Sequence, residues 1–345
     1  MIENAEGNLL QAEADALVNT VNCVGHMGKG IALQFKQAFP ENFAEYAKAC
    51  KGGEVQPGRM FVHDTGSMIS PRFIINFPTK RHWRGKSRME DIDAGLEALV
   101  AEVRRLGITS IAVPPLGCGY GGLEWTEVRP KIEEAFAEVP DVTVLLYAPQ
   151  AAPEAAARPV KTPKPKMTVA RALFICLMQQ YTELSYRLSQ LEIQKLAYFI
   201  QESGEPLRLR YEAGLYGPYA DNLNKVLELL EGHFIQGYSG SRKPDVALTV
   251  LPGAVEEARA FLTNHPDSSQ RLERTAEIIE GFETPYGMEL LSSAHWVAKH
   301  KEPPATTADE AINAFRLWNE RKARLFQPEH ICTAWERLES CGWLN

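Results

Sequence analysis

The sequence lacks the features that would place the protein in a membrane or outside the cell. Its 345 residues contain no run of about 18 apolar residues, the length needed to span a bilayer. The N-terminal MIENAEGN has no basic segment followed by an apolar core, so we expect no signal peptide. The six cysteines form no C-x-x-C pair, which disfavours a zinc site or a disulfide framework. These absences predict a cytoplasmic protein with reduced thiols and no membrane contact.

An excess of positive charge is also missing. The formal net charge is −7, which argues against a broad basic surface that grips duplex DNA. The charge does not exclude a narrow channel that admits one strand or one nucleotide.

Proline and alanine are concentrated in residues 151–166, which read AAPEAAARPVKTPKPK. Proline removes backbone donors and restricts the residue before it, so we expect a semi-extended linker. The linker predicts two domains, residues 1–150 and 167–345. Their formal charges are about −4 and −6, and that of the linker is about +3.

The first part alternates between two kinds of pattern. The predicted strands are 15–22, 59–65, 72–77, 110–117 and 142–148, and the predicted helices are 30–39, 89–107 and 125–139. This alternation predicts a three-layer α/β/α domain whose ligand loops lie at one end of the strands. The second part has mostly helical spacing with a few short extended pieces, which predicts a helical or α+β domain.

Two glycine-rich segments, CVGHMGKGIAL (23–33) and PPLGCGYGGLEW (114–125), each follow a predicted strand. Successive backbone N–H groups and a helix N-terminus make a site for phosphate oxygens, and glycine lets a ligand approach closely. Either segment alone is better explained as a tight turn. Both together in one α/β domain favour a clamp for a diphosphate.

Neither segment fits the common nucleotide motifs. GHMGKG lacks the Ser or Thr that follows lysine in a P-loop, and GKGIAL lacks the third glycine of the dinucleotide fingerprint. A nucleoside-triphosphate hydrolase and a nicotinamide dehydrogenase are therefore disfavoured.

The run GNLLQAEADALVNTVNCVGHMGKGIALQFKQAFP, followed by PPLGCGYGGLEW, resembles the macrodomain family of ADP-ribose-binding modules. The resemblance covers most of residues 1–150. It implies that the GNLL turn lies near the adenine, that Asn22 hydrogen-bonds the distal ribose and that the two glycine segments wrap the diphosphate. The residues implied around ADP-ribose are Asn8, Leu9, Thr20, Val21, Asn22, Gly28, Lys29, Gly30, Ile31, Ala32, Thr79, Gly117, Cys118, Gly119, Tyr120 and Gly121.

A basic segment, INFPTKRHWRGKSRMED (75–91), follows another predicted strand. Most charge runs are solvated loops. A lysine aimed into the cleft is, however, a useful nucleophile at an anomeric carbon if burial or nearby cations lower its pKa. We expect Arg81 and Arg84 to supply those cations.

The FPTK piece of that segment resembles the glycohydrolase macrodomains, and among them the DarG-type antitoxins, which remove ADP-ribose that DarT-type toxins attach to bases of single-stranded DNA. The resemblance implies that Lys80 is the catalytic lysine, with Thr79 beside it. It also implies that no metal and no cofactor are needed. A human relative has an aspartate in the second glycine segment that resolves the lysyl adduct, whereas this chain has Gly121 there. Glu124 is a possible substitute, although a carboxylate at a helix N-terminus is the simpler explanation.

DNA bound through a modified base would leave the cleft near the start of the basic segment. There, His82 and Trp83 offer stacking surfaces. The cations that offer phosphate contacts are Arg81, Arg84, Lys86 and Arg88, and the linker adds Arg158, Lys161, Lys164 and Lys166. A tryptophan that anchors the loop is an equally good explanation for Trp83.

The segment LEIQKLAYFIQESGEPLRLRYEAGLYGPYADNLNKVLELL (191–230) resembles the SocA-like, Panacea class of antitoxin domains, through QKLAYF and YGPY. The resemblance implies that the second domain binds a DarT-like toxin. Its negative charge would complement the basic cleft of a DNA-modifying enzyme. Alternatively, these motifs are core and turn residues, and the domain is a passive dimeriser.

The sequence thus supports an antitoxin whose first domain hydrolyses ADP-ribose from DNA bases with Lys80 and whose second domain blocks the toxin. Two alternatives remain open. In one, the first domain only reads ADP-ribose; in the other, it releases ADP-ribose from protein carboxylates.

Overall fold

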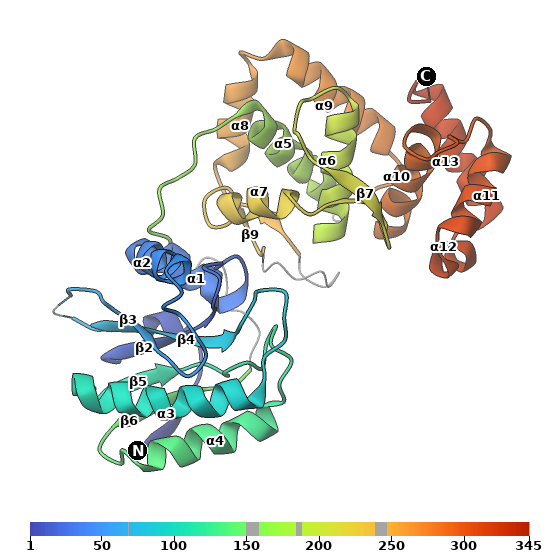
Figure 1. Ribbon diagram of the computed structural model, residues 1–345. Coiled ribbons are helices and arrows are strands. Elements are labelled where there is room, and N and C mark those ends of the chain that lie inside the picture. Colours follow the sequence, from blue (N-terminus) through green and yellow to red (C-terminus); the bar gives the residue numbers. More distant parts are fainter. Residues whose placement is uncertain (68, 150–158, 184–187, 239–246, 345) are drawn as a thin grey trace. The chain divides into compact units, whose positions relative to one another are not determined.

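A computed structural model describes residues 1–67, 69–149, 159–183, 188–238 and 247–344 (Figure 1). The chain divides into two compact units, Met1–Pro163 and Lys164–Asn345. The division falls within the predicted linker, of which residues 151–158, including Arg158, lie outside the described residues. No helix in the described part is both long and apolar enough to cross a membrane.

The first unit is built on one six-stranded sheet. Its elements are β1 (Ile2–Ala5), a short 3-10 helix η1 (Leu9–Gln11), β2 (Ala16–Asn22), α1 (Gly30–Ala38), α2 (Pro40–Lys51), β3 (Phe61–Asp64), β4 (Phe73–Lys80), α3 (Met89–Leu106), β5 (Ser110–Val113), α4 (Trp125–Ala137) and β6 (Thr143–Tyr147). The strand order is β1-β6-β5-β2-β4-β3, and only β3 runs antiparallel to its neighbour. This is the α/β architecture that the alternation of the sequence predicts. The sequence did not reveal β1 or α2.

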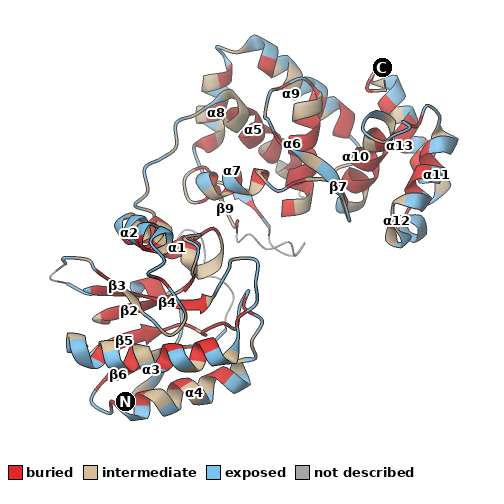
Figure 2. Cartoon of the chain, viewed as in Figure 1, coloured by how far each residue is buried: buried red, intermediate tan, exposed pale blue. Residues whose placement is uncertain are grey.

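Alternate residues of the strands face opposite layers, because side chains in a strand have a period of two. Ala16 and Val18 of β2 join Phe73, Ile75 and Phe77 of β4 in the core beneath α3 and α4. The intervening residues pack in a second core under η1 and α1, which includes Leu17, Ile74 and Phe35. Helices therefore cover both faces of the sheet (Figure 1). The central strands β2, β4 and β5 are almost wholly buried, whereas the edge strands β1 and β3 are partly exposed (Figure 2).

Strand β4 is longer than the prediction of 72–77, since it continues through the FPTK piece to Lys80. Its register against β2 shifts near this end, so that Val21 lies opposite Pro78 but Asn22 lies opposite Lys80. Proline cannot donate to the ladder and is found in sheets near such irregularities, which also re-aim side chains. The shift thus brings Lys80 level with the end of β2.

The second unit is mostly helical, as the sequence predicts. Its elements are α5 (Val169–Glu183), α6 (Gln190–Glu202), β7 (Tyr211–Gly214), β8 (Gly217–Ala220), α7 (Leu223–Leu230), β9 (Ile235–Gln236), β10 (Thr249–Val250), α8 (Ala254–Leu262), α9 (Pro266–Ile279), α10 (Pro285–Lys299), α11 (Ala308–Trp318), α12 (Glu320–Leu325) and α13 (Pro328–Ser340). The short strands form two antiparallel pairs, β7 with β8 and β9 with β10.

The QKLAYF and YGPY motifs meet in the interior of this unit. On α6, the Gln194 side chain donates to the carbonyl oxygen of Ala220 at 3.0 Å and accepts from its N–H at 2.9 Å. Lys195, which is 2% exposed, donates to the carbonyl oxygen of Pro218 at 2.6 Å. The polar side chains of QKLAYF therefore hold the backbone of β8, which contains most of YGPY, and QKLAYF is buried whereas Tyr216 at the start of YGPY is exposed.

Candidate functional site

Lys80 is the last residue of β4, and its side chain is half-buried at the end of the sheet. Its ammonium group donates a hydrogen bond to the backbone carbonyl oxygen of Tyr120, in the second glycine segment. A carbonyl partner does not neutralise the lysine as a carboxylate would. The amine is therefore held in place while it stays available for chemistry.

Burial lowers the pKa of Lys80, and the positive charge of Lys29 lowers it further. Both effects disfavour the charged form of the amine. The expectation that Arg81 and Arg84 would supply the cations is wrong in this respect, because the cation that acts on Lys80 belongs to the first glycine segment. Arg81 instead forms a two-point ion pair with the buried Asp91 of α3, at 2.9 and 3.2 Å.

The two glycine segments come together, as a shared diphosphate site requires. Gly30 starts α1 with a φ of +57°, and a Cβ atom added there would lie 3.3 Å from the ring of Tyr120. Lys29 is the N-cap residue of α1, and its side chain makes no capping hydrogen bond. The N–H groups that begin a helix attract anions, so this end of α1 suits a phosphate.

The second glycine segment forms a tight turn after β5. Gly117 has a φ of +73°, and its carbonyl oxygen accepts from the N–H of Leu123 at 3.1 Å. A Cβ atom added to Gly121 would overlap the carbonyl oxygen of Gly117 and the hydroxyl of Ser87. The turn therefore has no room for the aspartate of the human relative at position 121. Glu124 is the N-cap residue of α4, which agrees with its explanation as a carboxylate at a helix N-terminus.

Cys118, inside this turn, is not an activated thiol. Burial raises its pKa to about 11, and the charge of Glu124 contributes in the same direction. A thiol with a raised pKa is a poor nucleophile at neutral pH. Its position between the glycines remains compatible with ligand contact, but its chemistry is that of a small packing residue.

The residues implied to contact adenine and ribose also organise the loops. Asn8 caps η1 by accepting from the N–H of Leu10 at 3.1 Å, and Leu9 is buried in the core under α1. The Asn22 side chain accepts from the N–H of Val24 at 3.0 Å and donates to the carbonyl oxygen of His26. Asn22 therefore shapes the start of the first glycine segment.

The remaining implied residues line the ends of the central strands or the first glycine segment. Thr20 and Val21 belong to β2, Thr79 precedes Lys80 in β4, and Gly28 is buried ahead of α1. The Thr79 hydroxyl lies 3.5 Å from the carbonyl oxygen of Val21, which ties the two strands together. Ile31 and Ala32 lie in the first turn of α1. Gly119 lies in the second glycine segment, where an added Cβ atom would contact nothing within 4 Å.

Sequence reasoning missed a set of buried residues that support the site. The amide of Asn19 on β2 donates to Asn76 on β4 at 2.9 Å, and that of Asn76 donates to Asn42 on α2 at 2.7 Å. Also on α2, the buried Tyr46 donates to the carbonyl oxygen of Asn22 at 2.5 Å. Buried amides need hydrogen-bond partners. The three asparagines at strand and helix positions were therefore the signal in the sequence that could have indicated this supporting set.

The basic segment after Lys80 packs against the first glycine segment. The rings of Trp83 and His26 have centroids 5.4 Å apart, and those of Trp83 and His82 are 5.5 Å apart. The Arg84 guanidinium lies 4.5 Å from the Trp83 ring centre. Trp83 is partly exposed, whereas His82 and Arg84 are exposed. An aromatic and cationic surface therefore follows Lys80.

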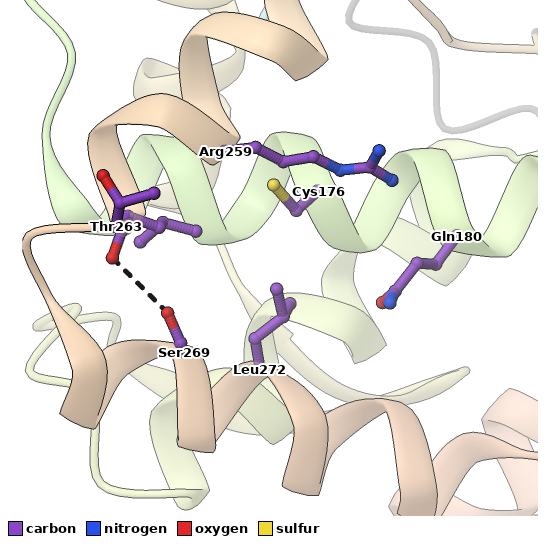
Figure 3. Close-up of a pocket in the computed structure, with 7 residues that line it drawn as sticks. Cys176, Gln180, Arg259, Thr263, Ser269 and Leu272 are labelled. Atoms are coloured by element: carbon purple, nitrogen blue, oxygen red, sulfur yellow. Dashed lines mark hydrogen bonds between the residues drawn. The ribbon is translucent and has the colours of Figure 1, made fainter.

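Metal ligation and a further pocket also bear on the chemistry that the described residues can support. They contain no group of three or more His, Cys, Asp or Glu side chains that could hold a metal ion. A pocket of about 190 Å³ lies between α5, α8 and α9 of the second unit, where Arg259 extends past Cys176 (Figure 3). Burial raises the pKa of Cys176, although the nearby Arg259 opposes this shift, so the thiol is not activated.

Comparison with known proteins gives the family. The Macro domain family matches residues 18–132. The DNA ADP-ribosyl glycohydrolase of Thermus aquaticus is 47% identical over 346 residues, which cover 100% of this chain and 95% of that protein. The protein of the same name from Mycobacterium tuberculosis is 42% identical over 98% of this chain and 99% of its own length.

Two further relatives match the first unit or part of it. A DNA ADP-ribosyl transferase–DNA ADP-ribosyl glycohydrolase fusion protein from Thermosipho africanus is 34% identical over 42% of this chain and 41% of that protein. The solved macrodomain of Mycobacterium tuberculosis DarG is 57% identical over 44% of this chain and 99% of its own, with a TM-score of 0.43. Since the Thermus aquaticus and Mycobacterium tuberculosis glycohydrolases align over nearly their whole lengths, the chain belongs to the DNA ADP-ribosyl glycohydrolase (DarG) family, whose first unit is a macrodomain.

Proposed function

We propose that the first unit removes ADP-ribose from bases of single-stranded DNA, with Lys80 as the reacting amine. The observation that carries this proposal is the position of Lys80, half-buried between the two glycine segments and held by the Tyr120 carbonyl. Clamping the diphosphate between these segments would present the distal ribose to the amine. The names of the full-length relatives support the choice of DNA as substrate.

In this scheme, the neutral amine of Lys80 attacks the anomeric carbon of the distal ribose. The bond between that carbon and the base nitrogen breaks, and the base leaves with the electron pair and gains a proton. Water then hydrolyses the imine-type adduct, which releases ADP-ribose and restores the amine. The lowered pKa of Lys80 raises the fraction of neutral amine at neutral pH.

The experiment is release of ADP-ribose from a modified single-stranded oligonucleotide, followed by mass spectrometry. We expect Lys80→Ala to slow release by about 1,000-fold or more, because the amine supplies the covalent step. The control is Lys51→Ala, which removes an exposed lysine at the end of α2. Calorimetry should show that both variants still bind ADP-ribose.

The outcomes separate the three hypotheses. If wild type binds ADP-ribose but leaves both DNA and protein modified, the site is a reader. If wild type releases ADP-ribose from a modified protein carboxylate but not from DNA, the substrate assignment is wrong. If Lys80→Ala remains active on DNA, the lysine assignment is wrong.

We further propose that the second unit binds and blocks a DarT-like toxin, which would make the whole chain its antitoxin. Its resemblance to antitoxin domains, its charge of about −6 and the natural fusion of a transferase with a glycohydrolase support this role. The full-length Lys80→Ala variant tests it, because that variant lacks the proposed repair activity. We expect it to inhibit DNA modification by the cognate toxin in vitro, whereas no inhibition at stoichiometric excess would contradict the proposal.

A further inference from the structure

Ser87 lies at the junction between the basic segment and α3, and it is buried although its neighbours are not. Its side chain is 7% exposed, whereas Lys86 and Arg88 on either side are exposed. The Ser87 N–H donates to the carbonyl oxygen of Gly121 at 3.0 Å. This hydrogen bond joins the segment that follows Lys80 to the second glycine turn.

The Ser87 side chain occupies the interior of that turn. A Cβ atom added to Gly117 would lie 3.1 Å from the Ser87 Cβ and 3.2 Å from its hydroxyl oxygen. A Cβ atom added to Gly121 would overlap the same hydroxyl. Ser87 thus fills the space toward which a side chain at position 121 would project. The two glycines are needed in part because Ser87 lies between them.

The hydroxyl of Ser87 has no hydrogen-bond partner among the described residues. A buried hydroxyl without a partner costs about 1–3 kcal/mol relative to one that is paired, so an alanine here would cost the fold little or nothing. Stability alone does not account for the serine. The turn that it fills carries the Tyr120 carbonyl, which accepts the hydrogen bond from Lys80. Ser87 is therefore linked to Lys80 in three steps. The Ser87 N–H donates to the Gly121 carbonyl oxygen, Gly121 follows Tyr120 in the chain, and the Tyr120 carbonyl oxygen accepts from Lys80.

We propose that Ser87 is a positioning residue that fixes the Tyr120 carbonyl and, through it, the amine of Lys80. The proposal rests on the function proposed above and adds a residue that no motif marks. Removal of the hydroxyl leaves a gap between Gly117 and Gly121, into which the turn relaxes. A displacement of about 1 Å at a reacting group can slow a reaction by about 100-fold.

The test compares full-length Ser87→Ala with Ser70→Ala, which makes the same change at an exposed serine of the β3–β4 connection. We expect kcat on the modified oligonucleotide to fall about 10-fold or more in Ser87→Ala alone. The Kd for ADP-ribose should stay within about 2-fold of wild type, and the Tm should be equal or higher, since an unpaired buried hydroxyl has been removed.

The pH dependence of kcat provides a readout that a purely structural role would not move. Loss of the Tyr120 acceptor destabilises the charged form of Lys80, so the rise in kcat should shift to lower pH in Ser87→Ala. An unchanged kcat, a lower kcat with an unchanged pH midpoint, or equal losses of Tm, binding and kcat would overturn the proposal. Failure of the proposed function is distinguishable, because wild type would then leave the oligonucleotide modified, or Lys80→Ala would remain active on it, whatever Ser87→Ala does.

Discussion

The two units treat their sequence motifs in opposite ways. In the first, the glycine segments follow β2 and β5, and Lys80 ends β4 with its side chain half-buried. In the second, Gln194 and Lys195 of QKLAYF are fully used in holding the YGPY strand. Short motifs of similar clarity in the sequence thus mark a chemical site in one unit and a buried scaffold in the other.

This difference decides which property a substitution in each motif should change. Replacing a side chain that makes internal hydrogen bonds changes the stability of the fold. Such a substitution alters partner binding only through the fold. Groups held open at the end of a sheet change binding or catalysis with little loss of stability. Four predictions below separate these two behaviours.

Among these four variants, the largest effect is expected from Gly121→Ala. The new Cβ atom overlaps backbone and the Ser87 hydroxyl, so the turn must open and the Tyr120 carbonyl must move away from Lys80. We expect at least a 100-fold loss of kcat on modified single-stranded DNA. Gly52→Ala is the control, because Gly52 lies at the exposed end of α2 with a φ of −78°, and the nearest atom to an added Cβ atom belongs to the Glu54 side chain, so its kcat should stay near that of wild type. Equal activities of the two variants would show that the turn does not position the lysine.

Lys195→Met should change stability, with a dependence on pH. Burial lowers the pKa of Lys195 to about 7, and the nearby Lys322 adds to the effect. Between about pH 7 and the ordinary lysine range the unfolded chain holds more protons than the folded one, so the lysine favours folding increasingly as pH rises. The unfolding free energy of wild type, relative to Lys195→Met, should therefore increase between pH 7 and pH 9, by at most about 1.4 kcal/mol per pH unit. Denaturant titrations at several pH values measure it, and a flat difference would contradict the buried-scaffold assignment.

Trp83→Ala distinguishes a stacking surface from a loop anchor. If Trp83 stacks on a DNA base, we expect KM for the modified oligonucleotide to rise about 10-fold, while the Kd for free ADP-ribose stays unchanged. If Trp83 mainly anchors the basic segment against His26, both values should rise together, because His26 belongs to the first glycine segment.

Lys29→Met should produce the smallest effect, a few-fold loss of kcat at pH 7. Removal of this cation raises the pKa of Lys80 toward its ordinary value, so less neutral amine is present and the rise in kcat moves to higher pH. Lys36→Met, in the last turn of α1, removes the same charge away from the site and should leave the midpoint in place. A shift of the same size in both variants would show that net charge alone is responsible.

Much of the first unit could be predicted from the sequence because its signals are local. Strand–helix alternation gives the sheet, glycine runs give the turns, and FPTK marks the lysine. The register shift in β4, the helix α2 and the asparagines that support the strands could not be predicted, because each depends on partners distant in the chain.

By itself, the sequence determined the α/β and helical classes of the two units, the two glycine segments and Lys80 as the candidate nucleophile. Only the tertiary structure decided that Lys29 is the cation that acts on Lys80, that Arg81 is paired with Asp91, and that Ser87 fills the turn where position 121 has no room for a side chain. The physical reason is that charge interactions and steric exclusion depend on distances across the end of the sheet. Those distances are set when β2, β4 and the turn after β5 pack together, not by spacing along the chain.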